Sequence, residues 1–200
     1  MRDLFVWLVV ITMTTFIITY VYKIYKHKIT PTLSTWIIFF LGTTLSFITY
    51  LIAEKHDLSS GILNTIDIAN VIIVITAIII FGKHTIHFNS FEKWYLGGVG
   101  FIIFYGFVSG NAWSSNIFTQ ILLCIGYAPT FHILLKNKIN TESFTAWGIN
   151  LVVSILALYP AIVEGNLLAS LYAIRATILI STLIIIMIYC EFYTKKRRKN

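Results

Sequence analysis

Long apolar runs separated by short polar segments dominate the pattern of hydrophobic and polar positions along the chain. An α-helix rises about 1.5 Å per residue, so about 20 apolar residues are needed to cross the hydrocarbon core of a bilayer. Six runs reach this length, near residues 4–22, 33–52, 62–81, 115–135, 144–163 and 167–190. A seventh run, near 94–109, is shorter and rich in glycine. The pattern predicts an all-α integral membrane protein with seven transmembrane helices.

Lysine and arginine support the odd number of helices and predict an orientation. Twelve of them lie on the side of the C-terminus, namely Lys23, Lys26, Lys28, Lys83, Lys93, Lys136, Lys138, Lys195, Lys196, Arg197, Arg198 and Lys199. Only Arg2 and Lys55 lie on the opposite side, and Arg175 lies within a helix. Because basic residues concentrate on the cytoplasmic side of membrane proteins, we predict an outside N-terminus and a cytoplasmic C-terminus. This asymmetry requires an odd number of spans, so the run near 94–109 is counted, and its Gly106-x-x-x-Gly110 spacing would allow close helix packing.

Two stretches, 26–67 and 136–175, follow the same plan. Each runs from a basic loop through a Ser/Thr-Trp helix start and an acidic turn to a charged residue inside the next helix. A duplicated three-helix unit would insert upside down, and one extra helix between the copies makes them parallel. We therefore predict a 3+1+3 arrangement, with repeats at 1–82 and 113–194, a linker with the fourth helix at 83–112, and a basic cytoplasmic tail at 195–200.

Composition and charge narrow the classes of protein. The 200 residues are 58% hydrophobic and 12% charged, which indicates that lipid is the solvent for most of the chain. The net charge of +7 is spread between apolar runs, so it indicates orientation in a membrane and no nucleic-acid partner. The first run lacks a cleavage site and is long, so we interpret it as a mature helix. We expect membrane lipids as partners, in the bacterial inner (plasma) membrane, and leave open whether the chain forms a homo-oligomer.

Signatures of enzymes, cofactors and metal sites are weak or missing. Cys124 and Cys190 lie in apolar runs, which argues against a disulfide framework or a zinc site. His84 and His87 lack nearby Cys or carboxylate ligands. The predicted spans hold no HExxH motif and no Ser-His pair, and they hold no lysine that could form a Schiff base with retinal. We therefore predict no enzyme activity, no cofactor and no metal.

Asp67 and Arg175 are the charged residues at the centre of the functional prediction. Each lies in the third helix of its predicted repeat, roughly 8–12 Å below the outer surface. An unpaired charge at this depth costs several kcal/mol, so each side chain should face protein or water. We predict a substrate site flanked by the carboxylate and the guanidinium. A structural salt bridge and snorkelling to the surface are the alternatives.

Polar and aromatic residues share helix faces with these two charges. Asn64, Asp67 and Asn70 are spaced i, i+3, i+6, and Tyr172 precedes Arg175 by three. Residues of the same kinds recur at helical spacing elsewhere, at Thr43, Tyr50, Gln120, Cys124, Tyr127 and Ser154. Hydrogen bonds between helices need the same residue types, so the evidence lies in their convergence. The predicted substrate-binding residues are Asp67, Arg175, Asn64, Asn70, Tyr172, Trp147, Asn150 and Trp36.

Two prolines inside predicted helices are candidate hinges. Proline removes a backbone donor and kinks a helix, so Pro129 and Pro160 could allow helices to bend, although static kinks are as common. Pro31 is better explained as a helix start. His132, just after Pro129, is a candidate for the cytoplasmic mouth or for carrying protons, with Asp67 as the second proton-coupling residue.

The chain resembles the SWEET/PQ-loop (MtN3-like) transporter superfamily. YAPTFHILLKNKINTESFTAW (127–147) is similar to the first helix and loop of bacterial half-size SWEETs, in which a Pro-Gln pair precedes a lysine and an acidic residue. Pro129, Lys138 and Glu142 keep this order, while Thr130 replaces the glutamine. Asn64 falls near the family's substrate-binding asparagine. The chain departs from the family in its first helix, which has no hinge proline, and in having Arg175 near the second substrate asparagine.

The resemblance implies a transporter that works by alternating access between two three-helix repeats. We predict a uniporter or proton-coupled carrier of a small polar solute. A zwitterion or anion is favoured, because a buried guanidinium binds carboxylate or phosphate through paired hydrogen bonds. The alternatives are a sugar uniporter of the ordinary SWEET type and a seven-helix sorting or sensory receptor that binds a ligand without turnover.

Overall fold

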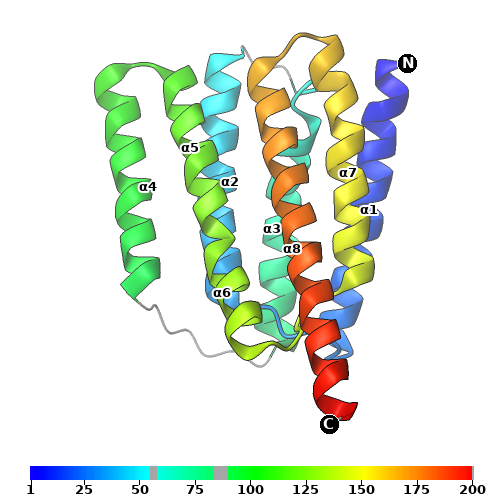
Figure 1. Ribbon diagram of the computed structural model, residues 1–200. Helices are drawn as coiled ribbons and strands as arrows, with labels where there is room; N and C mark the ends of the chain where they lie inside the picture. Colours follow the sequence, from blue (N-terminus) through cyan, green and yellow to red (C-terminus); the bar gives the residue numbers. More distant parts are fainter. Residues whose placement is uncertain (55–57, 83–89, 200) are drawn as a thin grey trace.

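The computed structural model describes residues 1–54, 58–82 and 90–199. These described residues form α-helices and no β-strand. The helices are α1 (Arg2–Tyr25), α2 (Leu33–Ala53), α3 (Ile62–Phe81), α4 (Ser90–Ser109), α5 (Ala112–Gly126), α6 (Ala128–Asn137), α7 (Phe144–Val163) and α8 (Leu167–Lys199). They stand side by side, with the two chain ends at opposite ends of the bundle (Figure 1).

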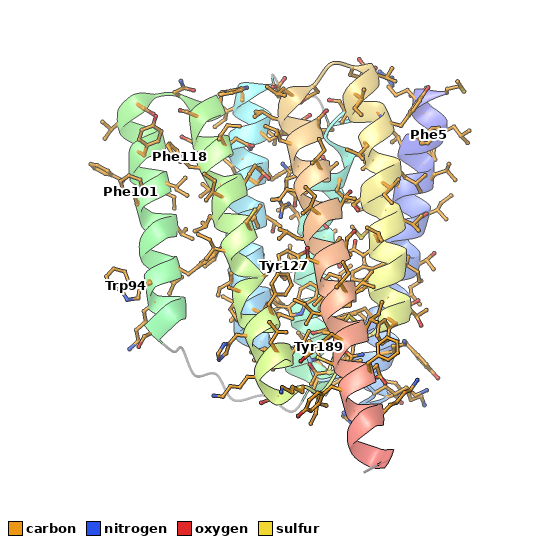
Figure 2. The ribbon with its side chains drawn as sticks, in the orientation of Figure 1. Phe5, Trp94, Phe101, Phe118, Tyr127 and Tyr189 are labelled. Carbon is orange, nitrogen blue, oxygen red and sulfur yellow. The ribbon has the colours of Figure 1, made fainter. Side chains whose placement is uncertain are left out.

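The surface of the bundle is apolar along most of its length. Within the described residues, six helices are long and apolar enough to cross a membrane: α1, α2, α3, α5 continued by α6, α7 and α8. Trp94 and Phe101 project from α4 away from the other helices (Figure 2) and are 82% and 62% exposed. Exposed apolar surface of this extent fits an integral membrane protein. Because α4 is not among the six, the seven-span count stays a prediction.

The pairs of helices that are in contact remain the same when the two predicted repeats are exchanged. Helix α3 packs on α1 and α2, and α8 packs on α5 and α7. Helix α1 packs on α7, and α5 packs on α2. Exchanging α1, α2 and α3 with α5, α7 and α8 converts each of these pairs into another, and the contact of α3 with α8 maps onto itself. Helix α4 lies at one edge, against α5 and α2 (Figure 1).

Periodic apolar residues and small residues explain this packing. The buried residues of α1 recur every three or four positions on one face, at Val9, Met13, Phe16, Tyr20 and Ile24. Between α2 and α5, a Cβ atom on Gly42 would lie only 2.6 Å from the side chain of Leu123. The missing side chain therefore lets these two helices approach closely, as small residues do in membrane proteins.

The predicted close packing at Gly106 is present, whereas Gly110 has a different role. A Cβ atom on Gly106 would lie 2.9 Å from Ser115 Oγ, so this glycine lets α4 approach α5. Gly110 has a φ of +60° and nothing within 4 Å of a Cβ, so it forms the turn after α4.

Two predicted spans match the structure to the residue, and two others differ from it in detail. Helices α3 and α7 occupy 62–81 and 144–163 as predicted. The predicted span 115–135 lies within the candidate span 112–137, which is divided into α5 and α6 at Tyr127, where Pro129 in the first turn of α6 cannot donate a backbone hydrogen bond. Helix α8 continues beyond the predicted span 167–190 to Lys199, so the predicted basic tail at 195–200 is helical as far as Lys199. Lysine and arginine are good helix formers and suit a helix C-terminus.

Candidate functional site

A small polar cavity lies between α2, α3, α5, α7 and α8. Its wall contains all the predicted substrate-binding residues except Asn64. The lining residues are Trp36, Phe39, Thr43, Leu63, Asp67, Asn70, Val71, Leu123, Tyr127, Trp147, Asn150, Ser154, Tyr172, Arg175, Ala176 and Ile180. About 40 Å³ is open to water-sized molecules. Since one water needs roughly 10–15 Å³ measured this way, the cavity in this conformation holds a few waters and no solute of several heavy atoms.

Asp67 and Arg175 face this cavity without pairing with each other. The Tyr172 hydroxyl donates to Asp67 Oδ2 at 2.8 Å, and Asn70 Nδ2 donates to Asp67 Oδ1 at 3.4 Å. Arg175 Nε donates to Gln120 Oε1 at 3.0 Å, and its guanidinium carbon lies 4.4 Å from the centroid of the Tyr172 ring. Among the described residues, the ion pairs that are present involve Arg2, and none joins Asp67 to Arg175. The alternative of a direct structural salt bridge therefore does not describe this arrangement.

Gln120 orients the guanidinium and is held in turn by α2 and α5. Its amide nitrogen donates to Ser46 Oγ and to Asn116 Oδ1, both at 3.0 Å, which turns its oxygen toward Arg175. Asn64 joins the same network through Ser46 Oγ at 3.2 Å, outside the cavity wall. The sequence pattern marked Gln120 as a polar residue of its helix. Its partner Arg175 lies on another helix, so the sequence did not indicate that Gln120 orients the guanidinium.

The cavity has unmet hydrogen-bonding capacity of opposite kinds on two sides. On α3, the side-chain oxygen of Asn70 is buried and accepts no hydrogen bond in the described structure. On α8, the side chain of Arg175 donates through Nε. Its two terminal nitrogens have no hydrogen-bond partner among the described residues. The α3 side therefore offers acceptors and a carboxylate, and the α8 side offers donors and a positive charge.

Aromatic side chains close the cavity toward the end that holds the C-terminus. The ring centroids of Tyr20 and Trp36 are 5.4 Å apart, those of Phe39 and Tyr127 are 4.8 Å apart, and those of Tyr127 and Trp147 are 6.3 Å apart. These rings come from α1, α2 and α7 and from the junction of α5 and α6. They form the floor of the cavity, because Trp36, Tyr127 and Trp147 also line it.

Glu142, in the loop before α7, fastens this floor. Its Oε2 atom accepts hydrogen bonds from the Tyr20 hydroxyl at 2.8 Å and from Trp147 Nε1 at 2.9 Å. Burial raises the pKa of Glu142, and the hydrogen bonds from Trp147 and Tyr20 lower that pKa in part. Beside it, Lys23 Nζ donates to Ser143 Oγ at 2.6 Å, so the loop before α7 is tied to α1 by two side chains.

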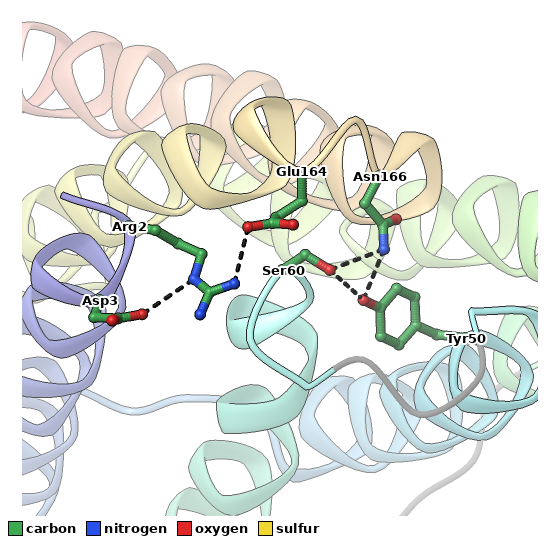
Figure 3. A network of polar contacts seen from close by, with 6 residues as sticks. All are labelled: Arg2, Asp3, Tyr50, Ser60, Glu164 and Asn166. Atoms are coloured by element: carbon green, nitrogen blue, oxygen red, sulfur yellow. Dashed lines mark hydrogen bonds and ion pairs between the residues drawn. The ribbon is translucent and has the colours of Figure 1, made fainter.

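A separate hydrogen-bonded cluster closes the end that holds the N-terminus (Figure 3). Asn166 Nδ2 donates to the Tyr50 hydroxyl at 3.0 Å and to Ser60 Oγ at 2.9 Å. The Tyr50 hydroxyl and Ser60 Oγ are hydrogen-bonded to each other at 3.1 Å. Nearby, Arg2 pairs with Glu164 at 2.9 Å on the surface. Sequence reasoning did not select Tyr20, Ser60 or Asn166. The one available signal was the position of Asn166 before α8, where asparagine caps helices.

The other predicted site residues lie away from the cavity. Pro160 is buried within α7, Pro129 is half-buried at the start of α6, and His132 is exposed on α6. None of the three lines the cavity. His84 and His87 lie outside the described residues. Within the part of the chain that is described, no three His, Cys, Asp or Glu side chains gather into a metal-binding group.

Comparisons with family models, with curated proteins and with solved structures found no match to this chain. The resemblance to the SWEET/PQ-loop superfamily therefore rests on the residues quoted from the sequence and stays a prediction.

Proposed function

We propose that the protein is a membrane carrier, a uniporter or a proton-coupled transporter, for a small polar solute that is zwitterionic or anionic. The observation that carries this proposal is the polar cavity between α3 and α8, which contains Asp67 and Arg175 and lies deep among apolar helices. Ionisable residues inside membrane spans are rare and usually belong to substrate or ion pathways.

The two closures of the cavity support a mechanism of alternating access. The cluster of Tyr50, Ser60 and Asn166 and the floor held by Glu142 share no residue, so each can open while the other stays closed. The exchangeable packing of the two halves is also what rocking of one three-helix unit against the other requires.

The chemistry of the cavity wall supports a charged solute over a neutral sugar. The terminal nitrogens of Arg175 present a planar set of donors that matches a carboxylate or phosphate. Asp67 and the unbonded oxygen of Asn70 on α3 match a positively charged donor. An anionic solute would bind Arg175, and a zwitterionic solute would bind both Arg175 and the oxygens of Asp67 and Asn70.

A thermal-shift panel on the detergent-purified protein tests the solute class. The panel holds sugars, amino acids, carboxylates, nucleosides and vitamin precursors, and it is repeated on Arg175→Ala and Arg175→Lys. A ligand at 100 times its dissociation constant stabilises a protein by about 2.7 kcal/mol. We expect stabilisation by an anionic or zwitterionic solute, lost in Arg175→Ala and weakened in Arg175→Lys, which keeps the charge without the paired donors. Stabilisation by a sugar that survives both changes would contradict this choice of solute and favour a sugar uniporter.

Counterflow in proteoliposomes then tests transport itself. We expect exchange of the stabilising solute, and a faster inward flux under an inward proton gradient if Asp67 takes up a proton. Equal flux with and without the gradient would remove proton coupling. Saturable binding without any flux would replace the carrier by a receptor.

A further inference from the structure

We propose that Asp67 and Asn70 form a sodium-binding site on the α3 side of the cavity. The inference goes beyond the proposed carrier, because the site exists whether or not a solute is transported. It rests on three features of the described structure: a carboxylate bonded to neutral groups alone, the buried amide group of Asn70 beside it, and a cavity of the size of an ion with a few waters.

The carboxylate of Asp67 accepts hydrogen bonds from neutral side chains only, among the described residues. Its two hydrogen bonds come from a tyrosine hydroxyl and an amide, and no basic side chain pairs with it among the described residues. Two carboxylate oxygens offer about four acceptor positions, so roughly half of this capacity is unused. A negative charge at this depth in a membrane needs a positive partner, which the protein does not supply by direct contact.

Asn70 supplies a second oxygen at the same place when its amide group is turned over. The residue is 4% exposed, lines the cavity, and its Oδ1 accepts no hydrogen bond in the described structure. Its amide nitrogen lies 3.4 Å from Asp67 Oδ1, a long contact for a hydrogen bond to a carboxylate. The two ends of an amide group differ little in shape, so turning the group over places its oxygen beside that carboxylate oxygen. A cation then bonds to both oxygens.

The charge and size of the site favour a small monovalent cation over zinc and other divalent ions, and we propose sodium. Carboxylate and amide oxygens are ligands for hard cations, whereas zinc prefers histidine and cysteine. The carboxylate of Asp67 and the guanidinium of Arg175 on the opposite wall already cancel, so a divalent cation would leave two uncompensated positive charges in the cavity, whereas sodium leaves one. The room of about 40 Å³ accommodates a small ion with water, but it does not accommodate the ammonium group of a whole solute in this conformation.

Sodium at Asp67 would also prepare the cavity for the solute of the proposed function. With the carboxylate neutralised, Arg175 is the remaining charge, and the repulsion between Asp67 and an anionic solute is removed. The affinity for an anionic solute should therefore rise with sodium, and by linkage the affinity for sodium should rise equally with solute. This consequence rests on the proposed carrier, whereas sodium binding itself does not.

Thermal unfolding in the absence of solute tests the site. The purified protein is heated in sodium, potassium or choline chloride at constant ionic strength. We expect a saturable rise of the unfolding midpoint with sodium alone. Asp67→Asn should abolish the rise, and Asn70→Ala should weaken sodium binding at least about tenfold, which corresponds to roughly 1.4 kcal/mol. Glu164→Gln removes the same charge at a surface position and should keep the full sodium response.

Direct binding of radioactive sodium to the wild-type protein keeps the test decisive if Asp67→Asn fails to fold. We expect saturable binding that unlabelled sodium displaces and that potassium and choline leave in place. Equal stabilisation by the three salts, no saturable binding, or an unchanged response in Asp67→Asn would each overturn the proposal. Absence of solute flux with sodium binding intact would remove the carrier alone.

Discussion

Arg175 is held by one neutral amide and one aromatic ring, and both contacts leave its charge in place. Gln120 fixes the direction of Nε, and Tyr172 lies under the guanidinium. A cation over an aromatic ring is stabilised by about 0.5–2 kcal/mol, which is less than the cost of a buried charge. The residue is therefore oriented but not neutralised, the state expected of a side chain that receives an anion.

Gly61 is required by the ring of Tyr50 at the N-terminal closure. A Cβ atom on Gly61 would overlap that ring, which is buried and bonded to Ser60 and Asn166. We expect Gly61→Ala to lower the free energy of unfolding by about 1–3 kcal/mol, the usual result of overpacking. Gly148→Ala is the control, because nothing lies within 4 Å of its Cβ. Thermal unfolding of both variants is the measurement, and equal midpoints would contradict the prediction.

Glu142 should give the protein a distinctive dependence on pH. Its pKa is raised in the folded protein above the unfolded value of about 4.3. Its contribution to stability is therefore full below that pH and is lost as the pH rises through the folded pKa. Glu142→Gln cannot ionise, so the difference in unfolding free energy between wild type and variant should shift in favour of the variant as the pH rises from about 4 into the neutral range.

The control for Glu142 is Glu54→Gln, the same change in a cap residue at the other end of the bundle. Thermal unfolding of the wild type and both variants across this pH range measures the shift. A difference between wild type and Glu142→Gln that stays constant with pH would exclude the burial of Glu142 as a source of pH dependence.

At the scale of elements, the interruption between α5 and α6 is the main departure from regular helices. The break lies at Tyr127, whose ring is part of the cavity floor, and Pro129 follows in the first turn of α6. A break at this point couples the direction of α6 to the position of the floor. Helix α7 contains Pro160 without interruption, because a proline within a helix removes one hydrogen bond and can leave the rest intact.

Replacing Pro129 tests whether this break is a hinge. Pro129→Ala restores a backbone donor and allows one continuous helix from 112 to 137. We expect an unchanged or higher unfolding midpoint together with a slower initial rate of uptake of the solute found by the panel. Pro31→Ala, which lies before α2 and outside any helix, should leave the rate unchanged. An unchanged rate in Pro129→Ala would mark the break as a static kink.

At the scale of the whole molecule, the described helices form a bundle that is closed at both ends around a small cavity. The N-terminal closure consists of hydrogen bonds between α2, the turn before α3 and the cap of α8. The C-terminal closure consists of tilted aromatic rings, two of which are bonded to Glu142. Because the two closures share no residue, the proposed carrier would open the cavity to one side of the membrane by separating the helices at one end.

Weakening the N-terminal closure should expose the cavity from that side. Asn166→Ser keeps a side chain that can cap α8, where Asn166 Oδ1 now accepts from the Ala169 N–H at 2.9 Å, but it is too short to reach Tyr50 and Ser60. We expect a loss of about 1–3 kcal/mol in stability and faster labelling of a cysteine placed at Thr43 by a membrane-impermeant maleimide.

The matched control is Asn111→Ser, because Asn111 caps α5 in the same way at an exposed position. Both variants are made in a background without Cys124 and Cys190. Equal labelling rates in the two variants would show that the cluster of Tyr50, Ser60 and Asn166 does not control access.

The sequence by itself determined the helices, because apolar runs long enough for a bilayer leave few other structures open to the chain. It located α3 and α7 to the residue, since glycine and polar residues bound these runs sharply. It also selected Asp67 and Arg175, because a charge within an apolar run is conspicuous whatever surrounds it. It did not locate the break at Tyr127 or the end of α8, since proline tolerance and helix continuation depend on neighbouring contacts.

Tertiary structure alone decided how the polar residues are shared between cavity, network and closures. Asn64 and Asn70 look equivalent in the sequence, yet one joins Ser46 and the other faces the cavity. Gln120 and Arg175 are 55 residues apart, and Tyr20 and Glu142 are 122 apart, so no local pattern could have paired them. Helix periodicity specifies which residues share a face, but the partner of that face depends on how the helices pack, and this packing gave each polar side chain its role.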